Sequence, residues 1–180
     1  MVIASTKGHL NLKDEFGFTA IIKASADGYS DIVKLLIANK AEINTKNGPG
    51  HTALIWSARQ GHKEIVECLV AKGAKINDKD QNGSTAFIEA ANNGHLEIVK
   101  YLAGKGAKTD LKDKWGNTPL ILAATDGHLE VIKYLVENGA KLNSKNNRGH
   151  SAMSRATQSN HNQVVDYLLS KGAKIDKKTR

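Results

Sequence analysis

The chain has 180 residues, of which 40% are apolar, 24% are charged and 5% are aromatic, so it can bury a core, but one built from small aliphatic side chains. Its formal net charge is +8, and its single cysteine, Cys68, excludes an intramolecular disulfide and a cysteine-based zinc site. No apolar run reaches membrane-spanning length, and the one after Met1 is too short for a signal peptide. We therefore expect a cytoplasmic protein, or a periplasmic or otherwise exported one if a signal peptide has been removed.

Equivalent residues recur at a constant interval along the chain. One set of glycines is spaced by 33 residues at Gly17, Gly50, Gly83, Gly116 and Gly149, and a second at Gly28, Gly61, Gly94 and Gly127, with Asn160 in the fifth place. A fixed period of this length predicts stacked repeats rather than a single-core globule. We expect a partial cap or leader at 1–13, one repeat domain at 14–178 and a tail at 179–180. The repeats are placed at about 14–46, 47–79, 80–112, 113–145 and 146–178.

The two ends of the array depart from the repeated pattern. Residues 1–13 are too few for a complete preceding helix pair, and Lys40 replaces a capping glycine of the first repeat. Terminal repeats expose a face that inner repeats bury, so polar substitutions are expected there. The residues that fit this capping role are Lys23 and Ser25 in the first repeat and Ser154, Arg155 and Thr157 in the last.

Two short antiparallel helices are predicted in each repeat, and the fourth repeat shows them most clearly. Its first helix is predicted to begin at Pro119, after the N-cap Thr118, and to carry a narrow stripe of small apolar residues. Gly127 ends that helix. The second helix carries two adjacent apolar rows and ends near Gly139. The polar, turn-rich segment 140–149 is then predicted to project as a hairpin-like loop.

The motif of this fourth repeat resembles the ankyrin repeat. The pattern D-x-x-G-x-T-P-L is followed by A-A-x-x-G-H-x-E-V-I and N-G-A-x-x-N, and related strings recur over more than nine tenths of the chain. The resemblance implies an all-α solenoid of stacked antiparallel helix pairs with projecting hairpin-like loops. It also implies that the loops and the first helices line a concave side that grips partners. The departures are local, since only Pro119 supplies the proline of T-P-L.

Regular columns of histidine and acidic residues have structural interpretations. His62, His95, His128 and His161 recur with the period, but packed helices lie about 8–10 Å apart, whereas ligands of one zinc lie about 2 Å from it. Each histidine is therefore predicted to begin a second helix and to bond nearby backbone. Glu64, Glu97 and Glu130, with Asp31, complement helix dipoles, and Cys68 is interpreted as a packing residue. With no catalytic or nucleotide motif, we predict no enzymatic activity, cofactor or metal.

Positions that are equivalent across repeats share one environment, so a column of mixed residue types is predicted to face solvent. Three columns on one face of the first helices are of this kind: Lys23, Trp56, Glu89, Leu122, Arg155; Ala26, Arg59, Asn92, Thr125, Gln158; and Asp27, Gln60, Asn93, Asp126, Ser159. The loop tips vary as well: Phe16 and Phe18, Pro49 and His51, Asn82 and Ser84, Trp115 and Asn117, Arg148 and His150.

We predict a protein-binding site on this side, centred on repeats two to four. Trp56 and Trp115 are the expected anchors, because tryptophan, tyrosine and arginine most often dominate binding energy. The remaining predicted contacts are Phe16, Phe18, Pro49, His51, Arg59, Gln60, Asn82, Asn92, Asn93 and Asp126. An alternative stays open, in which the loop aromatics pack against adjacent loops and Trp56 fills a gap between helices.

Basic residues form two further columns, Lys13, Lys46, Lys79, Lys112, Lys145 and Lys178, and Lys75, Lys108, Lys141 and Lys174. Such ladders attract acidic proteins or nucleic acid, but duplicated solvated loops produce the same pattern, and the aromatic interleaving of single-strand binders is absent.

The expected function is that of a monomeric, non-enzymatic module that binds another protein, either an enzyme or a protein with an acidic surface. Inhibition or immunity-type protection of an enzyme is the sharpest version, because short free-standing ankyrin proteins resembling this chain occur in bacteria. Binding of nucleic acid or another polyanion is the alternative. An enzyme with an unrecognised site is a remote one.

Overall fold

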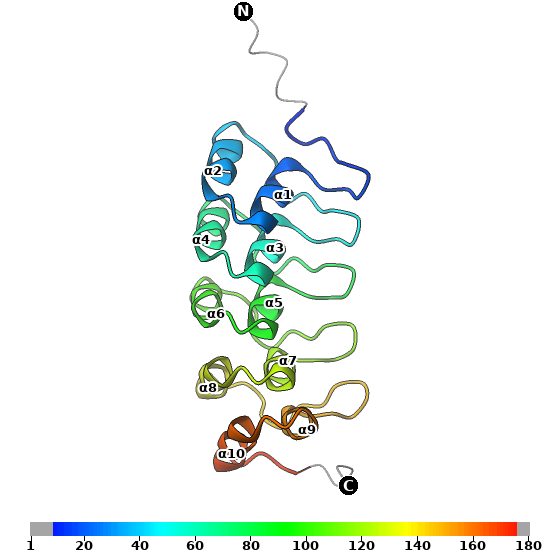
Figure 1. Ribbon diagram of the computed structural model, residues 1–180, viewed down its shortest axis with the longest axis vertical. Helices are drawn as coiled ribbons and strands as arrows, with labels where there is room; N and C mark the ends of the chain where they lie inside the picture. The colour runs from blue at the N-terminus through cyan, green and yellow to red at the C-terminus, as the bar shows by residue number, and fades with distance from the viewer. Residues whose placement is uncertain (1–8, 176–180) are drawn as a thin grey trace, which may run out of the picture.

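The computed structural model describes residues 9–175, which form ten α-helices and no strand (Figure 1). The helices, in chain order, are α1 (Ala20–Asp27), α2 (Ser30–Ala38), α3 (Ala53–Gln60), α4 (Lys63–Ala71), α5 (Ala86–Asn92), α6 (Leu96–Gly104), α7 (Pro119–Asp126), α8 (Leu129–Glu137), α9 (Ala152–Gln158) and α10 (Asn162–Ser170). They stack as five antiparallel pairs with a projecting loop before each pair. The all-α solenoid predicted from the sequence is confirmed.

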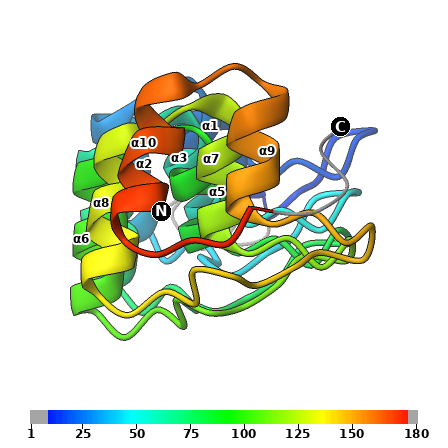
Figure 2. The ribbon, with the colours of Figure 1, turned by 90° about the horizontal axis from the view of Figure 1, so that it is seen from below.

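Three layers run along the stack. The odd-numbered helices pack against one another in the middle layer, the even-numbered helices form the outer layer, and the loops form the third (Figure 2). Seen along the stack, the loops leave the helix pairs sideways, so the loops and the middle helices enclose a corner that runs the length of the molecule. We call this corner the concave face.

The middle helices begin at hydrogen-bonded caps. The hydroxyl oxygens of Thr52, Thr85 and Thr118 each accept the backbone N–H three residues later, at 3.2, 3.3 and 3.2 Å. Ser151 does the same for the N–H of Ser154, whose hydroxyl accepts the Ser151 N–H in return, which makes a capping box. The predicted N-cap Thr118 is confirmed, and three of the four helices without proline, α3, α5 and α9, keep a side-chain cap.

The histidine column joins each repeat to the one before it. The Nε2 atoms of His62, His95, His128 and His161 lie 3.2, 3.0, 3.0 and 3.0 Å from backbone carbonyl oxygens of the preceding middle helix. Each histidine also stands at the N-cap of its outer helix. The prediction that these histidines begin the second helices and bond backbone is confirmed, with the carbonyl supplied by the neighbouring repeat.

Glycine at the turn between paired helices leaves room for that histidine. Gly94 has a φ of 75°, and a Cβ there would lie 2.5 Å from Nδ1 of His128. Asn160 holds the same place in the last repeat with a φ of 59°. No following histidine packs on Asn160 in the described part of the chain, so a side chain is tolerated there. Glycine is thus required by the contact as well as by the backbone angle.

The core is a continuous row of small aliphatic side chains between repeats, with Phe87 as its largest fully buried member. Two polar residues that the sequence assigned to exposed ends, Ser25 and Ser154, are buried instead. That prediction was wrong: Ser25 is fully buried in α1, and the Ser154 hydroxyl is used in the capping box at the start of α9. Lys23 and Thr157 are exposed, as expected of end residues.

The loops form a hydrogen-bonded platform. In the third loop Asp80 Oδ1 accepts the backbone N–H groups of Asn82 and Ser84, both at 2.8 Å, and Asp113 and Asn146 close the next two loops in the same way. Neighbouring loops are also joined, for example by the N–H of Lys114 to the carbonyl of Asn82 at 2.8 Å. Residues on the loop tips are therefore held in fixed positions relative to the middle helices.

Candidate protein-binding surface

The three variable columns of the middle helices are accessible to solvent. None of their residues, from Lys23 to Ser159, is buried, so the columns face solvent as predicted. Some of these residues meet the loops directly: Trp56 contacts the rings of Phe18 and His51. Leu122, Thr125 and Arg155 line one pocket together with loop residues. These columns mix charged, polar and aromatic residues, whereas most of the buried positions between them keep small or apolar residues.

Trp56 is the centre of an aromatic cluster at the N-terminal end of this face. Its ring lies 5.9 Å from that of Phe18 and 5.0 Å from that of His51, measured between centroids, and the Arg59 guanidinium lies 5.4 Å from its centre. The side chain is half-buried, and its buried Nε1 has no hydrogen-bond partner among the described residues. Trp56 therefore joins the first two loops to α3 and presents only part of its surface to a partner.

His51 is held by the third loop. It is 8% exposed, and its Nε2 lies 3.1 Å from Oδ2 of Asp80. Burial lowers the pKa of His51 below its ordinary value of 6.5, while Asp80 and Glu89 oppose that shift. Nε2 is the ring nitrogen that donates to the Asp80 carboxylate, and the buried Nδ1 has no partner among the described residues.

Other predicted contacts are more accessible. Phe16 and Trp115 are 65% and 46% exposed on their loops, and Pro49 is exposed on the second loop. Gln60 and Asp126 are exposed on the middle helices. The Lys114 ammonium lies 4.5 Å from the centre of the Trp115 ring, so a cation covers part of one face of this aromatic anchor.

Most of the predicted polar contacts already have partners inside the chain. Arg59 Nε lies 3.8 Å from Oε2 of Glu89. Asn93 donates its side-chain N–H to the Glu89 carbonyl at 2.9 Å, Asn92 accepts His128 through its own carbonyl, and Asn82 Oδ1 accepts Lys114 Nζ. These bonds engage one side-chain atom each of Asn82 and Asn93, whereas the bond at Asn92 uses its backbone carbonyl and leaves its side-chain amide available to a partner.

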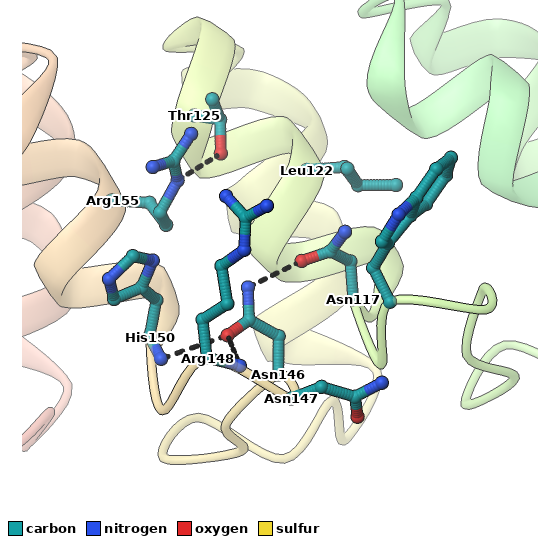
Figure 3. A pocket seen from close by; sticks show the side chains of 9 residues that line it. Asn117, Leu122, Thr125, Asn146, Asn147, Arg148, His150 and Arg155 are labelled. Carbon is teal, nitrogen blue, oxygen red and sulfur yellow. Dashed lines mark hydrogen bonds between the residues drawn. The ribbon is translucent and has the colours of Figure 1, made fainter.

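A pocket of about 310 Å³ opens on the concave face between the fourth and fifth repeats (Figure 3). Loop residues form one side and helices α7 and α9 the other; the lining residues are Trp115, Asn117, Leu122, Thr125, Asn146, Asn147, Arg148, His150 and Arg155. Asn146 Nδ2 donates to Asn117 Oδ1 at 2.7 Å and so ties the two loops together at the pocket floor. Of the predicted contacts only Trp115 lines this pocket.

A family comparison agrees with this architecture. The model for ankyrin repeats in three copies matches residues 2–80, 21–113 and 87–179. The chain belongs to the ankyrin-repeat family. Ankyrin repeats are generally non-enzymatic protein–protein interaction modules, so a protein partner is indicated. No curated protein matches the chain, and no helix within residues 9–175 has the length and apolarity that crossing a membrane requires.

One lysine column has a role within the ankyrin stack. The ammonium groups of Lys13, Lys46, Lys79 and Lys112 each donate to the backbone carbonyl of the next lysine in the column, at 2.8, 2.8, 3.3 and 3.0 Å. Lys178, the last member, lies outside the described residues. The second column, from Lys75 to Lys174, is exposed throughout. The first column is mostly exposed as well, so it joins neighbouring loops and also presents positive charge to solvent.

Three residues that line the pocket between the fourth and fifth repeats are not among the contacts predicted from the sequence: Arg148, His150 and Arg155. All three lie in variable positions, but the predicted contacts are centred on repeats two to four. A signal was present, because Arg155 and Thr125 occupy the positions that Glu89 and Arg59 occupy two repeats earlier. Comparing such cross-repeat pairs reveals which arginine has an acidic neighbour within the chain.

Proposed function

We propose that this ankyrin protein is a non-enzymatic module that holds another protein against its concave face and blocks part of that partner's surface. The observation that carries this proposal is the exposed Trp115, which stands on a hydrogen-bonded loop beside a pocket on a surface of variable residues. Rigid aromatic side chains surrounded by polar groups are typical centres of protein interfaces.

Occlusion of an enzyme is the version of this function that we favour. A stack of repeats recognises a surface by covering it, and a protein that covers an active site inhibits the enzyme or protects the cell from it. Such a module works as a monomer in the cytoplasm or wherever its target enzyme is found. The predicted contacts on the first four loops and on α3, α5 and α7 belong to this proposal, with Trp56 as a second anchor beside Trp115.

The experiment is affinity capture from an extract of the source organism, with the full chain as bait. A partner should be recovered in stoichiometric amount by the wild type and lost with Trp115→Ala. The matched control is Tyr29→Ala, because Tyr29 is also an exposed aromatic but stands at the N-cap of the outer helix α2. A partner that the Tyr29 variant loses and the Trp115 variant retains would place binding on the outer layer.

A further inference from the structure

The pocket between the fourth and fifth repeats gathers positive charge that the chain does not neutralise. Its lining contains Arg148, His150 and Arg155 and no acidic side chain. Neither arginine takes part in an ion pair within residues 9–175, although ion pairs are numerous elsewhere on the surface. The nearest loop carboxylate, Asp113, is buried, and its oxygens accept hydrogen bonds from Trp115 and Asn117.

The repeats supply an internal comparison for this missing charge. Between the second and third repeats, Arg59 faces Glu89 at 3.8 Å. The equivalent positions between the fourth and fifth repeats hold Thr125 and Arg155, and Arg155 Nε donates to the Thr125 hydroxyl at 3.2 Å. The acidic member of the pair has thus been replaced by arginine, and the former arginine by a neutral residue. The pair of positions that forms an ion pair between the second and third repeats therefore carries, between the fourth and fifth, a positive charge with no ionic partner among the described residues.

The geometry of the two arginines leaves donors available. Arg155 also donates through Nη1 to Gln158 Oε1 at 3.1 Å, which orients its planar guanidinium and leaves its other N–H groups without a hydrogen-bond partner among the described residues. The Arg148 guanidinium has no hydrogen bond to any described residue, and Figure 3 shows its side chain extending from the loop toward Leu122 and Thr125 of α7. Arg148 thus enters the pocket from the loop side and Arg155 from the helix side, and both line the same pocket.

An apolar wall adjoins this charge. Leu122 and the exposed Trp115 line the same pocket. We propose that the pocket binds an acidic side chain of the partner protein, with its carboxylate on Arg148 and Arg155 and a neighbouring apolar residue against Trp115 and Leu122. This inference rests on the proposed function, since it names what the concave face recognises. Guanidinium groups match the planar carboxylate with two parallel hydrogen bonds.

A nucleic-acid strand fits the pocket less well. Single-strand binding sites stack bases on bare aromatic faces, whereas the only tryptophan, tyrosine or phenylalanine ring lining this pocket has the Lys114 ammonium 4.5 Å from its centre. The cations are also confined to one small pocket instead of following a groove. A carboxylate beside an apolar side chain uses both the charge and the apolar wall.

The test is an NMR titration of the full isotope-labelled chain with two short capped peptides. One peptide carries a glutamate between two leucines, and its twin carries glutamine in place of that glutamate. At concentrations up to millimolar, the glutamate peptide should shift the Arg148 and Arg155 Nε–H signals and the Trp115 indole signal, and the glutamine peptide should bind at least about tenfold more weakly. Equal binding of the two peptides, or no shift of these signals, would overturn the proposal.

Single substitutions distinguish binding by the pocket arginines from nonspecific attraction to the positive surface of the protein. Arg148→Gln and Arg155→Gln should each weaken glutamate-peptide binding about tenfold, and Arg155→Lys should recover only part of the loss because it keeps the charge without the fork. Lys72→Gln removes the same charge from an exposed site at the end of α4 and should have no effect. An oligothymidylate that shifts the same signals at lower concentration than the glutamate peptide would assign the pocket to nucleic acid.

Failure of this inference is distinguishable from failure of the proposed function. A captured partner that binds both arginine variants normally but is lost with Trp115→Ala would remove the carboxylate pocket and leave the concave face as the binding surface. Glutamate-specific binding without any captured protein would support the pocket and count against the proposed module.

Discussion

Ile32 and Ile65 occupy the same position in successive outer helices, yet Ile32 is 47% exposed and Ile65 is 1% exposed. The difference arises because the preceding repeat covers Ile65, whereas no described residue covers Ile32 to the same extent. Tyr29 and Leu35 on the same helix are exposed as well. The stability of the stack is thus carried by contacts between neighbouring repeats.

Truncation of these two isoleucines should have unequal effects. Ile65→Ala should lower the free energy of unfolding by about 2–5 kcal/mol, because it leaves a cavity between repeats. Ile32→Ala should cost less than about 1 kcal/mol, because the side chain is already in contact with water. Urea titrations followed by circular dichroism would measure both. Similar losses for the two variants would contradict the conclusion that contacts with the preceding repeat account for the burial of Ile65.

Lys40 is a second site with an internal control. It adopts a φ of 67°, where the later repeats have glycine, and a Cβ on those glycines meets no atom within 4 Å. Lys40→Gly should therefore raise the free energy of unfolding by up to about 1 kcal/mol, because relief of about 1–2 kcal/mol of backbone strain is partly offset by the greater freedom of glycine in the unfolded chain.

Gly94→Ala should lower the free energy of unfolding, in contrast to Lys40→Gly. The added Cβ would meet the His128 ring at 2.5 Å in a backbone conformation that alanine rarely adopts, so the loss should exceed about 1 kcal/mol. The same urea titrations compare the two variants. A destabilised Lys40→Gly variant would show that the lysine side chain contributes more than its strained backbone costs.

The pKa of His51 should lie below its ordinary value of 6.5 in the folded protein, because the ring is buried. At pH values between the lowered pKa and 6.5, His51 therefore binds a proton in the unfolded chain more readily than in the folded chain. The contribution of His51 to stability is present above pH 6.5 and is lost as the pH falls from there toward the lowered pKa.

An NMR titration of the His51 ring tests this directly. In Asp80→Asn the pKa should fall further, since the Asp80 carboxylate opposes the effect of burial. A His51 pKa at or above its ordinary value would mean that the Asp80 carboxylate outweighs burial.

The exposed lysine column should affect how fast an acidic partner binds. Replacing Lys75, Lys108 and Lys141 together by glutamine should lower the association rate constant several-fold, by about 1 decade at most, and leave the dissociation rate nearly unchanged, because peripheral charge steers encounter. Surface plasmon resonance at two salt concentrations would measure both rates. If the dissociation rate rises as much as the association rate falls, the lysines are direct contacts.

Much of the fold follows from the sequence because the repeat multiplies weak local signals. Thr118 and Pro119 alone predict one helix start, but four more equivalent starts fix the period, and the position of the histidine column follows from it. The site is less predictable, because columns show which residues face solvent but not what each one touches. Arg59 and Arg155 are both arginines in variable columns of the middle helices. Arg59 nevertheless faces the carboxylate of Glu89, whereas Arg155 faces the hydroxyl of Thr125.

The aromatic residues illustrate the same limit. Trp56 and Trp115 are both predicted anchors. The packing of the Trp56 ring with Phe18 and His51, however, depends on how the first two loops lie against α3. Trp115 has no such ring neighbour among the described aromatic contacts and is the more accessible of the two. Whether either one binds a partner stays a prediction.

The most direct measurement is titration calorimetry of the captured partner with wild type, Trp56→Ala and Trp115→Ala, alongside circular dichroism of each variant. We predict that each substitution weakens binding by about 2 kcal/mol or more while the helical content stays that of the wild type. Normal binding by both variants, or loss of binding that merely follows the unfolding of a repeat, would contradict a binding site anchored by these tryptophans on the concave face.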